Sequence, residues 1–141
     1  MRMAYLLVLG LGLSQGGAAK DAAIKKDKDA MQGTWSVVAV TSEGKDAESS
    51  KLIGAQVIFK DDKVRGKGIR LGKDNECGYK IDPTSKIKAI DFIDQDGTVV
   101  PGIYQLDGTK LNICTTAPKS PRPGSFEPKR GSGLVLIKLR K

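Results

Sequence analysis

Histidine is absent from the 141-residue chain, which has 16 carboxylate side chains and two cysteines, Cys77 and Cys114. Without imidazole, histidine-based catalytic triads, histidine metal sites and histidine acid–base chemistry are excluded. A serine or cysteine nucleophile would need a lysine or a carboxylate as its base, and no recognisable motif arranges one. We therefore expect a protein that is not an enzyme, and a hydrolase is the most distant alternative.

Two short motifs resemble parts of ion-binding or phosphate-binding loops, but each lacks residues that the complete motif requires. Asp94-Gln95-Asp96-Gly97 opens like a calcium loop, but residues 98–101 add no acidic ligand and no terminal glutamate follows. Gly66-Lys67-Gly68 is too short to cradle a phosphate. We therefore expect a simple turn at Asp94, and neither a metal ion nor a cofactor.

The chain begins with the pattern of a secretory signal peptide. Arg2 precedes an uncharged apolar stretch over residues 3–13, and Gly17-Ala18-Ala19 offers small residues for cleavage before Lys20. That stretch is too short to cross a bilayer of about 30 Å as a helix, and a buried strand or helix is the alternative. We expect residues 1–19 to be removed on export to the periplasm or extracellular space. Residues 20–30 would then form a flexible charged leader, and residues 31–141 the folded domain.

From residue 33 onward, apolar and polar residues alternate with a period close to two, which indicates β-strands. Turn signals such as Asp61-Asp62 and Asp107-Gly108 separate these segments. The pattern predicts eight strands, at residues 33–40, 55–60, 63–69, 77–81, 88–93, 99–106, 110–115 and 134–140. Eight antiparallel strands joined by tight turns can close an up-and-down barrel, which removes exposed sheet edges. A two-sheet sandwich of the same strands is the alternative.

Two connections are long enough to shape a binding site. Residues 47–53 are expected to form a short helix in the first long loop, with Leu52 and Ile53 facing the core. Residues 116–133 hold four prolines and must wrap the surface. Both connections lie at one end of an up-and-down barrel. We therefore expect a single elaborated mouth lined by Leu52, Ile53 and Phe126, with Lys119, Arg122, Lys129 and Arg130 on its rim. Such a rim would favour an anionic ligand; the alternative is that Phe126 only anchors a surface loop.

The two cysteines leave a disulfide open. Oxidising conditions after export favour a bond between Cys77 and Cys114. Strand parity opposes it, because Cys77 shares the inward face of Tyr79 whereas Cys114 has the opposite parity to Ile113. A single β-bulge would reconcile the two.

The start of the first strand, Gly33-Thr34-Trp35, resembles the glycine-x-tryptophan signature of lipocalins. More closely, residues 31–140 resemble a family of small exported planctomycete domains of unknown function, thought to be lipocalin-like. The matching segments, in order, are Gln32-Gly33-Thr34-Trp35-Ser36-Val37-Val38, Ile81-Asp82-Pro83-Thr84, Lys88-Ala89-Ile90-Asp91-Phe92, Gly102-Ile103-Tyr104-Gln105-Leu106-Asp107-Gly108, Leu111-Asn112-Ile113-Cys114 and Gly131-Ser132-Gly133.

This resemblance implies a lipocalin-like barrel and brings no catalytic residues. Trp35, the only tryptophan, is expected to plug one end of the barrel, and Tyr104 is expected in the core. In lipocalins a basic residue near the end of the last strand packs over the signature tryptophan. The resemblance therefore implies a cation–π contact from Arg140 or Lys138.

The formal net charge of +8 comes from basic residues that are spread along the chain. Export and a low aromatic content argue against nucleic acid, whereas anionic envelope polymers suit the compartment. We expect a non-enzymatic binding module for a small apolar or amphipathic ligand. The alternative is a structural or interaction protein of the cell envelope, with a side-chain-filled barrel and a cationic surface. The free volume inside the barrel discriminates between the two.

Overall fold

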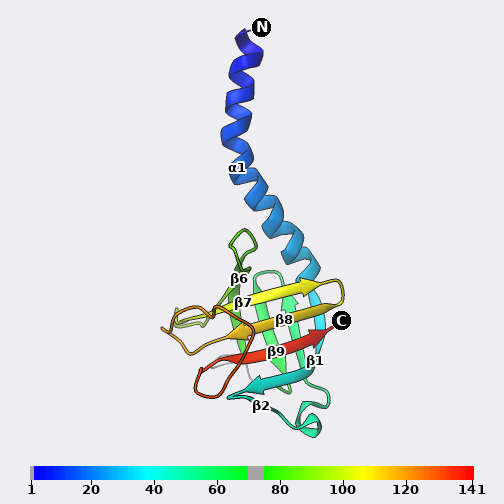
Figure 1. The fold of residues 1–141 in the computed structure, drawn as a ribbon. Helices are drawn as coiled ribbons and strands as arrows, with labels where there is room; N and C mark the ends of the chain where they lie inside the picture. Colours follow the sequence, from blue (N-terminus) through cyan, green and yellow to red (C-terminus); the bar gives the residue numbers. More distant parts are fainter. Residues whose placement is uncertain (1, 70–74) are drawn as a thin grey trace.

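The computed structural model describes the backbone of residues 2–69 and 75–141, and the side chains of residues 17–69 and 75–141. In the described residues, a long helix precedes a set of short strands (Figure 1). The elements are α1 (Arg2–Met31), β1 (Gly33–Ser42), β2 (Lys45–Asp46), the 3₁₀ helix η1 (Ser49–Leu52), β3 (Gln56–Lys60), β4 (Lys63–Lys67), β5 (Glu76–Asp82), β6 (Ala89–Ile93), β7 (Val99–Asp107), β8 (Lys110–Thr115) and β9 (Val135–Arg140).

The strands form one antiparallel sheet that closes on itself. Apart from β2, each strand pairs with the next along the chain, and β9 returns to pair with β1. β2 is a two-residue extension that pairs only with the end of β1, so eight strands make the wall. The fold is therefore the predicted eight-stranded, up-and-down, lipocalin-like barrel and not a two-sheet sandwich. The short helix predicted in the first long loop is present as η1.

The two ends of this barrel are unlike. The helix end carries the last turn of α1, the β3–β4 and β7–β8 hairpins, and the β5–β6 turn (Figure 1). The loop end carries the β1–β2 turn, the β6–β7 turn and the long connection over residues 116–134, which we call the 116–134 loop. The strand registers place Asp61 and Gly108 in tight turns with positive φ at the helix end, as their sequence predicts.

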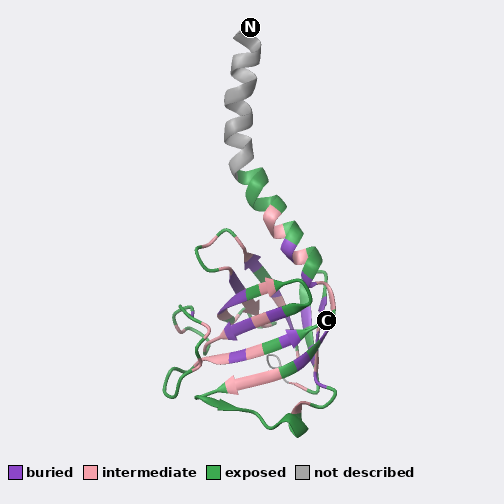
Figure 2. Cartoon of the chain, turned by 45° about the vertical axis from the view of Figure 1, so that its right-hand side comes forward, coloured by how far each residue is buried: buried purple, intermediate pink, exposed green. Residues whose placement is uncertain are grey.

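Alternation along the strands separates an apolar interior from a polar exterior. In β4, for example, only Val64 and Gly66 are buried. Figure 2 shows the same alternation around the wall. Large aromatic residues gather in the interior, where the rings of Phe59 and Tyr79 meet edge to face at 5.1 Å between centroids. Trp35, Tyr104 and Phe59 are at most 1% exposed, which confirms Trp35 and Tyr104 as core residues.

A second apolar cluster lies on the outside of the wall. Ile103, Cys114 and Leu136 are neighbours across β7, β8 and β9, and all three are buried. Phe126 and Leu134 from the 116–134 loop pack against them. The loop therefore stays on the surface because it covers an apolar patch that would otherwise face water.

Residues 20–30 do not form the flexible leader that their charge suggests. They continue α1, and the last turn of the helix packs onto the barrel. Ile24, Asp27 and Met31 recur at helical spacing on one face, so they can all point toward the wall. Met31 is fully buried and Asp27 only 7% exposed. In the part of the chain that the structure describes, no helix is long and apolar enough to cross a membrane.

The start of β1 is fixed by the C-terminal residue. Gly33 has φ 113°, a conformation that side chains disfavour, and a Cβ there would lie 3.3 Å from Lys141 Cε. Lys141 Nζ lies 4.9 Å from the centre of the Trp35 ring and donates hydrogen bonds to Ala30 O and Gln32 O. The expected cation–π contact therefore comes from Lys141, not from Arg140 or Lys138. Strand alternation explains the correction, because Arg140 and Lys138 are exposed on the outer face.

We expect Trp35→Ala to lower the free energy of unfolding by about 3–5 kcal/mol. The substitution leaves a cavity among buried residues and removes the hydrogen bond of 2.8 Å from Trp35 Nε1 to Met31 O. Urea melts followed by circular dichroism measure the change. A loss under about 1 kcal/mol would show that Trp35 is not the plug of the helix end.

Candidate functional site

The barrel interior contains a cavity of about 260 Å³ toward the loop end. Its walls come from six of the eight wall strands and from the residue that follows β6. The lining residues are Val57, Cys77, Phe92, Asp94, Val100, Ile113, Thr115, Val135, Ile137 and Leu139. Most of these are inward-facing aliphatic side chains, so the cavity is an apolar chamber with a few polar groups.

The polar groups of the cavity lie near its mouth. Asp94 is the first residue of the β6–β7 turn, where its carbonyl oxygen accepts a hydrogen bond from Gly97 N at 2.9 Å. Thr115 is the last residue of β8. A carboxylate and a hydroxyl therefore stand where an apolar ligand would end in a polar group, and the carboxylate disfavours an anionic one.

Beside Asp94, Cys77 supplies a buried thiol to the cavity wall. Burial raises its pKa to about 11, and the nearby negative charge of Asp94 adds to this increase. The thiol is therefore protonated at neutral pH and is a poor nucleophile. In this setting Cys77 is a small buried residue in the wall of the cavity.

The residues predicted to line the mouth lie elsewhere. Leu52, at the end of η1, packs against the main core, whereas Ile53 is 84% exposed and points away from it. Phe126 belongs to the outer apolar cluster, so the alternative in which it anchors a surface loop is confirmed. None of the three is among the described residues that line the cavity. The long connections do flank the loop end, where the mouth was expected, but strand residues shape the chamber.

The cationic rim is also displaced from the cavity. Arg122 forms an ion pair with Asp91 at 2.9 Å and donates hydrogen bonds to Ile90 O and Gly102 O, which straps the 116–134 loop to the outside of β6 and β7. Lys129 pairs with Glu127 within the loop. Lys119 and Arg130 are exposed, and neither lines the cavity. The preference for an anionic ligand was predicted from basic residues around the mouth, and these residues do not line the cavity.

The two cysteines are free, so the disulfide left open by the sequence is absent from the structure. Cys77 faces the interior, and Cys114 lies in the outer cluster beneath the 116–134 loop. Both are buried. The wall of the barrel separates them, as strand parity alone predicts, and no bulge in β8 changes the parity of Cys114.

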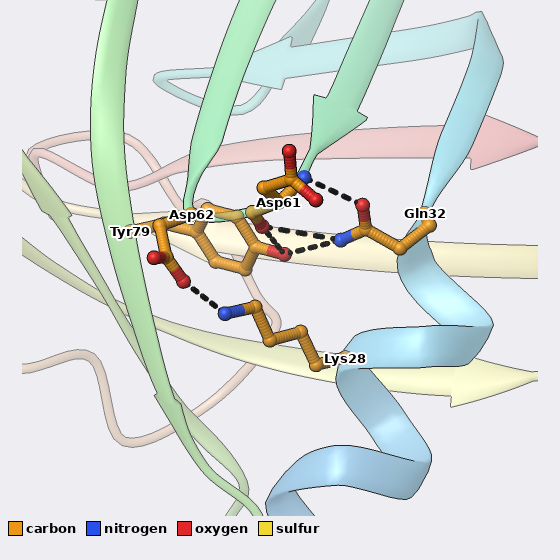
Figure 3. A network of polar contacts seen from close by, with 5 residues as sticks. All are labelled: Lys28, Gln32, Asp61, Asp62 and Tyr79. Carbon is orange, nitrogen blue, oxygen red and sulfur yellow. Dashed lines mark hydrogen bonds and ion pairs between the residues drawn. The ribbon is translucent and has the colours of Figure 1, made fainter.

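The opposite end of the interior is closed by polar contacts from α1 and the residue after it. Both polar atoms of the Gln32 side-chain amide form hydrogen bonds with Asp61 in the β3–β4 hairpin. Nε2 donates to Asp61 O at 3.2 Å, and Oε1 accepts from Asp61 N at 2.7 Å. Gln32 Nε2 also donates to the hydroxyl of Tyr79 at 2.9 Å. Lys28 forms an ion pair with Asp62, which holds the pKa of that carboxyl below its usual value (Figure 3).

A buried carboxylate extends this closure to β7. Tyr104 Oη donates a hydrogen bond to Asp27 Oδ2 at 2.7 Å, and Lys88 Nζ donates to the same oxygen at 2.8 Å. The charge of Asp27 is thus compensated by a cation and a phenol, which a carboxylate at 7% exposure requires. The helix end is therefore a structural closure, and the accessible part of the interior is at the loop end.

The size of the inward-facing side chains along each strand indicates which end of the barrel is filled and which end is open. Inward positions near the helix end carry aromatic rings, as at Trp35, Phe59 and Tyr104, whereas those near the loop end carry mostly smaller side chains, as at Val100 and Ile137. Combining strand parity with side-chain size along each strand predicts which half of the barrel is filled. Loop length, which suggested Leu52 and Phe126, carries no such information.

Comparisons of the chain with protein families, curated proteins and solved structures find no match. The resemblance to the exported planctomycete domains therefore stays a prediction.

We expect the free energy of unfolding to fall as pH rises from about 10 to about 12. Burial raises the pKa of Tyr79 to about 12, and burial together with the hydrogen bond to Asp27 raises the pKa of Tyr104 as well. The folded chain thus retains protons that the unfolded chain loses above its tyrosine pKa of about 10. Both contributions are complete below that pH and are lost as pH rises through the folded values.

Urea melts of the native chain and of Tyr79→Phe between pH 8 and pH 12 check this expectation. The lysines titrate in both proteins, so the difference between the two curves isolates the tyrosine. The variant should show a shallower decline. Parallel curves would mean that the phenol of Tyr79 ionises equally easily in the folded and unfolded chains.

Proposed function

We propose that this protein is a non-enzymatic binding module whose barrel holds a small apolar or amphipathic ligand at the loop end. The observation that supports the proposal most is the apolar cavity of about 260 Å³ lined by inward-facing strand residues. An eight-stranded barrel can be filled by side chains or can hold one small ligand. In this barrel the helix end is filled by side chains, and the loop end contains the cavity.

The size of the cavity limits the ligand. Ligand pockets usually measure about 300–1,000 Å³, and an apolar cavity of about 150 Å³ is enough to bind benzene. A volume of about 260 Å³ therefore suits a molecule with one or two rings or a short alkyl chain, and is too small for a long fatty acid. The barrel keeps such a molecule away from water, and Asp94 and Thr115 meet its polar end.

The chemistry of the mouth favours a neutral or cationic polar end over an anionic one. Asp94 is the charged residue among the described lining residues. A carboxylate ligand placed beside it would experience like-charge repulsion in a partly desolvated setting, whereas an amine or a hydroxyl would donate a hydrogen bond. This chemistry narrows the amphipathic ligands to donors of hydrogen bonds.

The alternative, an envelope protein with a fully side-chain-filled barrel, has support from the helix end alone. There, Met31, Trp35 and Phe59 leave at most 1% of their surfaces exposed. The unfilled loop end favours the binding module.

Export through a signal peptide over residues 1–19, with delivery to the periplasm or extracellular space, is part of the proposal. The described contacts between α1 and the barrel begin at Lys20, which pairs with Asp82 at 3.7 Å. Cleavage before Lys20 would therefore preserve those contacts. The N-terminus of the chain recovered outside the cytoplasm tests this part separately.

We expect Val100→Phe to abolish binding of a small apolar probe. Val100 lines the cavity, and a benzyl side chain there would occupy much of a 260 Å³ space. The probe is 1-naphthylamine, which is neutral at pH 7, carries a hydrogen-bond donor and gains fluorescence in apolar surroundings. Titration of the native chain should show saturable binding, and the variant should bind at least tenfold more weakly.

Val99→Phe is the matched control, because Val99 is 42% exposed and absent from the cavity lining. Urea melts establish that both variants are folded. Equal affinity of the native chain, Val100→Phe and Val99→Phe for the probe would contradict binding inside the barrel. Absence of saturable binding to the native chain would contradict a cavity that accepts apolar molecules of this size.

A further inference from the structure

Charge is divided unequally around the barrel wall. The five neighbouring strands β4, β3, β1, β9 and β8 contain no aspartate or glutamate. They carry seven basic residues, namely Lys60, Lys63, Arg65, Lys67, Lys110, Lys138 and Arg140. The other three wall strands, β5, β6 and β7, carry four acidic residues and one lysine. We call the outer surface of the five strands the basic face.

All seven basic residues of this face are exposed. None of them forms an ion pair with another described residue. The acidic neighbours lie at its borders: Asp61 and Asp62 in the β3–β4 turn, Glu76 opposite Arg65 on β5, and Asp107 opposite Lys110 on β7. The interior of the basic face thus presents positive charge that the described part of the chain does not neutralise.

Strand register arranges part of this charge in a row. Lys67 is opposite Gln56, Gln56 is opposite Ser36, and Ser36 is opposite Arg140, which in turn is opposite Lys110. Five strands at a spacing of about 4.8 Å give the row a length of about 19 Å across the wall. It has cations at both ends and an amide and a hydroxyl in the middle.

This arrangement works against stability. Arg140 and Lys110 are directly opposite each other, as are Lys60 and Lys63. Like charges in such cross-strand positions repel and destabilise a sheet. An acidic residue in one position of each pair would remove this repulsion, and neither pair has one. An anion bound across the row would offset the repulsion between Arg140 and Lys110.

We propose that the basic face is a docking surface for an acidic polysaccharide. The row is longer than a single small anion, so an extended polymer that carries several negative charges can contact the cations at both of its ends. Between the cations stand the hydroxyl and amide side chains of Thr34, Ser36, Gln56 and Asn112, which can bond to the hydroxyl groups of sugars.

The same surface is a poor match for other anionic partners. The outward-facing residues of the five strands include no aromatic side chain on which a nucleic-acid base could stack. The wall of a barrel is convex, so a flat membrane would meet only a narrow strip of it. This surface is separate from the cavity at the loop end, so the proposal does not depend on ligand binding inside the barrel.

Binding of the full chain to dextran sulfate tests the proposal, with neutral dextran as the reference polymer. The row variant combines Lys67→Gln, Arg140→Gln and Lys110→Gln. The matched control combines Lys80→Gln, Lys86→Gln and Lys119→Gln, which removes the same charge from exposed lysines off the basic face. Titrations at several salt concentrations give affinity and its salt dependence.

We expect the row variant to bind dextran sulfate at least tenfold more weakly, with a shallower dependence of affinity on salt because fewer counterions are released. The control should change affinity less than threefold. Equal losses in both variants would overturn the proposal, since they would show a response to net charge alone. Tighter binding to a single-stranded oligonucleotide or to vesicles containing anionic lipid would overturn the choice of polysaccharide.

Urea melts separate docking from a structural role. Removing like charges that face each other should leave the unfolding midpoint of the row variant unchanged or raise it. A lower midpoint together with weaker binding would overturn the proposal, because the row would then be needed for the fold itself.

Discussion

A closed sheet of eight strands encloses an interior that is just narrow enough for its own side chains to fill. The rest of this structure depends on which part of that interior the side chains fill and which part they leave empty. Closure through the pairing of β1 with β9 removes the sheet edges and fixes the inward-facing positions. The helix end of the interior holds Trp35, Phe59 and Tyr104, whereas the side chains that line the cavity at the loop end are mostly smaller and aliphatic. The cavity follows from that difference in side-chain volume.

The closed end needs a cover, and α1 provides it through polar as well as apolar contacts. Met31 is buried against the core, and Asp27 brings a carboxylate to Tyr104 and Lys88. Such a buried pairing adds little net stability, but it disfavours docked positions of the helix in which Asp27 would be buried without Tyr104 and Lys88. The helix end is thereby held closed, and access to the interior is left to the loop end.

The sequence predicts the eight strands closely, because period-two alternation and the turn residues at Asp61 and Gly108 act locally. It fails where tertiary packing decides. The charges around Asp27 suggested a solvated leader, yet the apolar spacing of Ile24 and Met31 docks the helix. Phe126 lies in a long loop near the predicted mouth, but an apolar patch formed by three separate strands holds it outside the barrel.

Arg140 and Arg122 also lie elsewhere than the family resemblance and the loop length predict. Lys141, and not Arg140, covers Trp35, because strand alternation turns Arg140 outward. Arg122 was expected at a mouth, whereas backbone carbonyls of β6 and β7 and the carboxylate of Asp91 draw it to the wall. The contacts of Lys141 and Arg122 cannot be predicted from the sequence until the order and register of the strands are known.

A crystal structure of the protein under xenon pressure tests the division of the interior most directly, because xenon occupies apolar cavities. The account predicts xenon at the loop end, among Val57, Ile113 and Ile137, and no xenon beside Trp35. A barrel that takes up no xenon at the loop end, or takes it up at the helix end instead, would contradict the account.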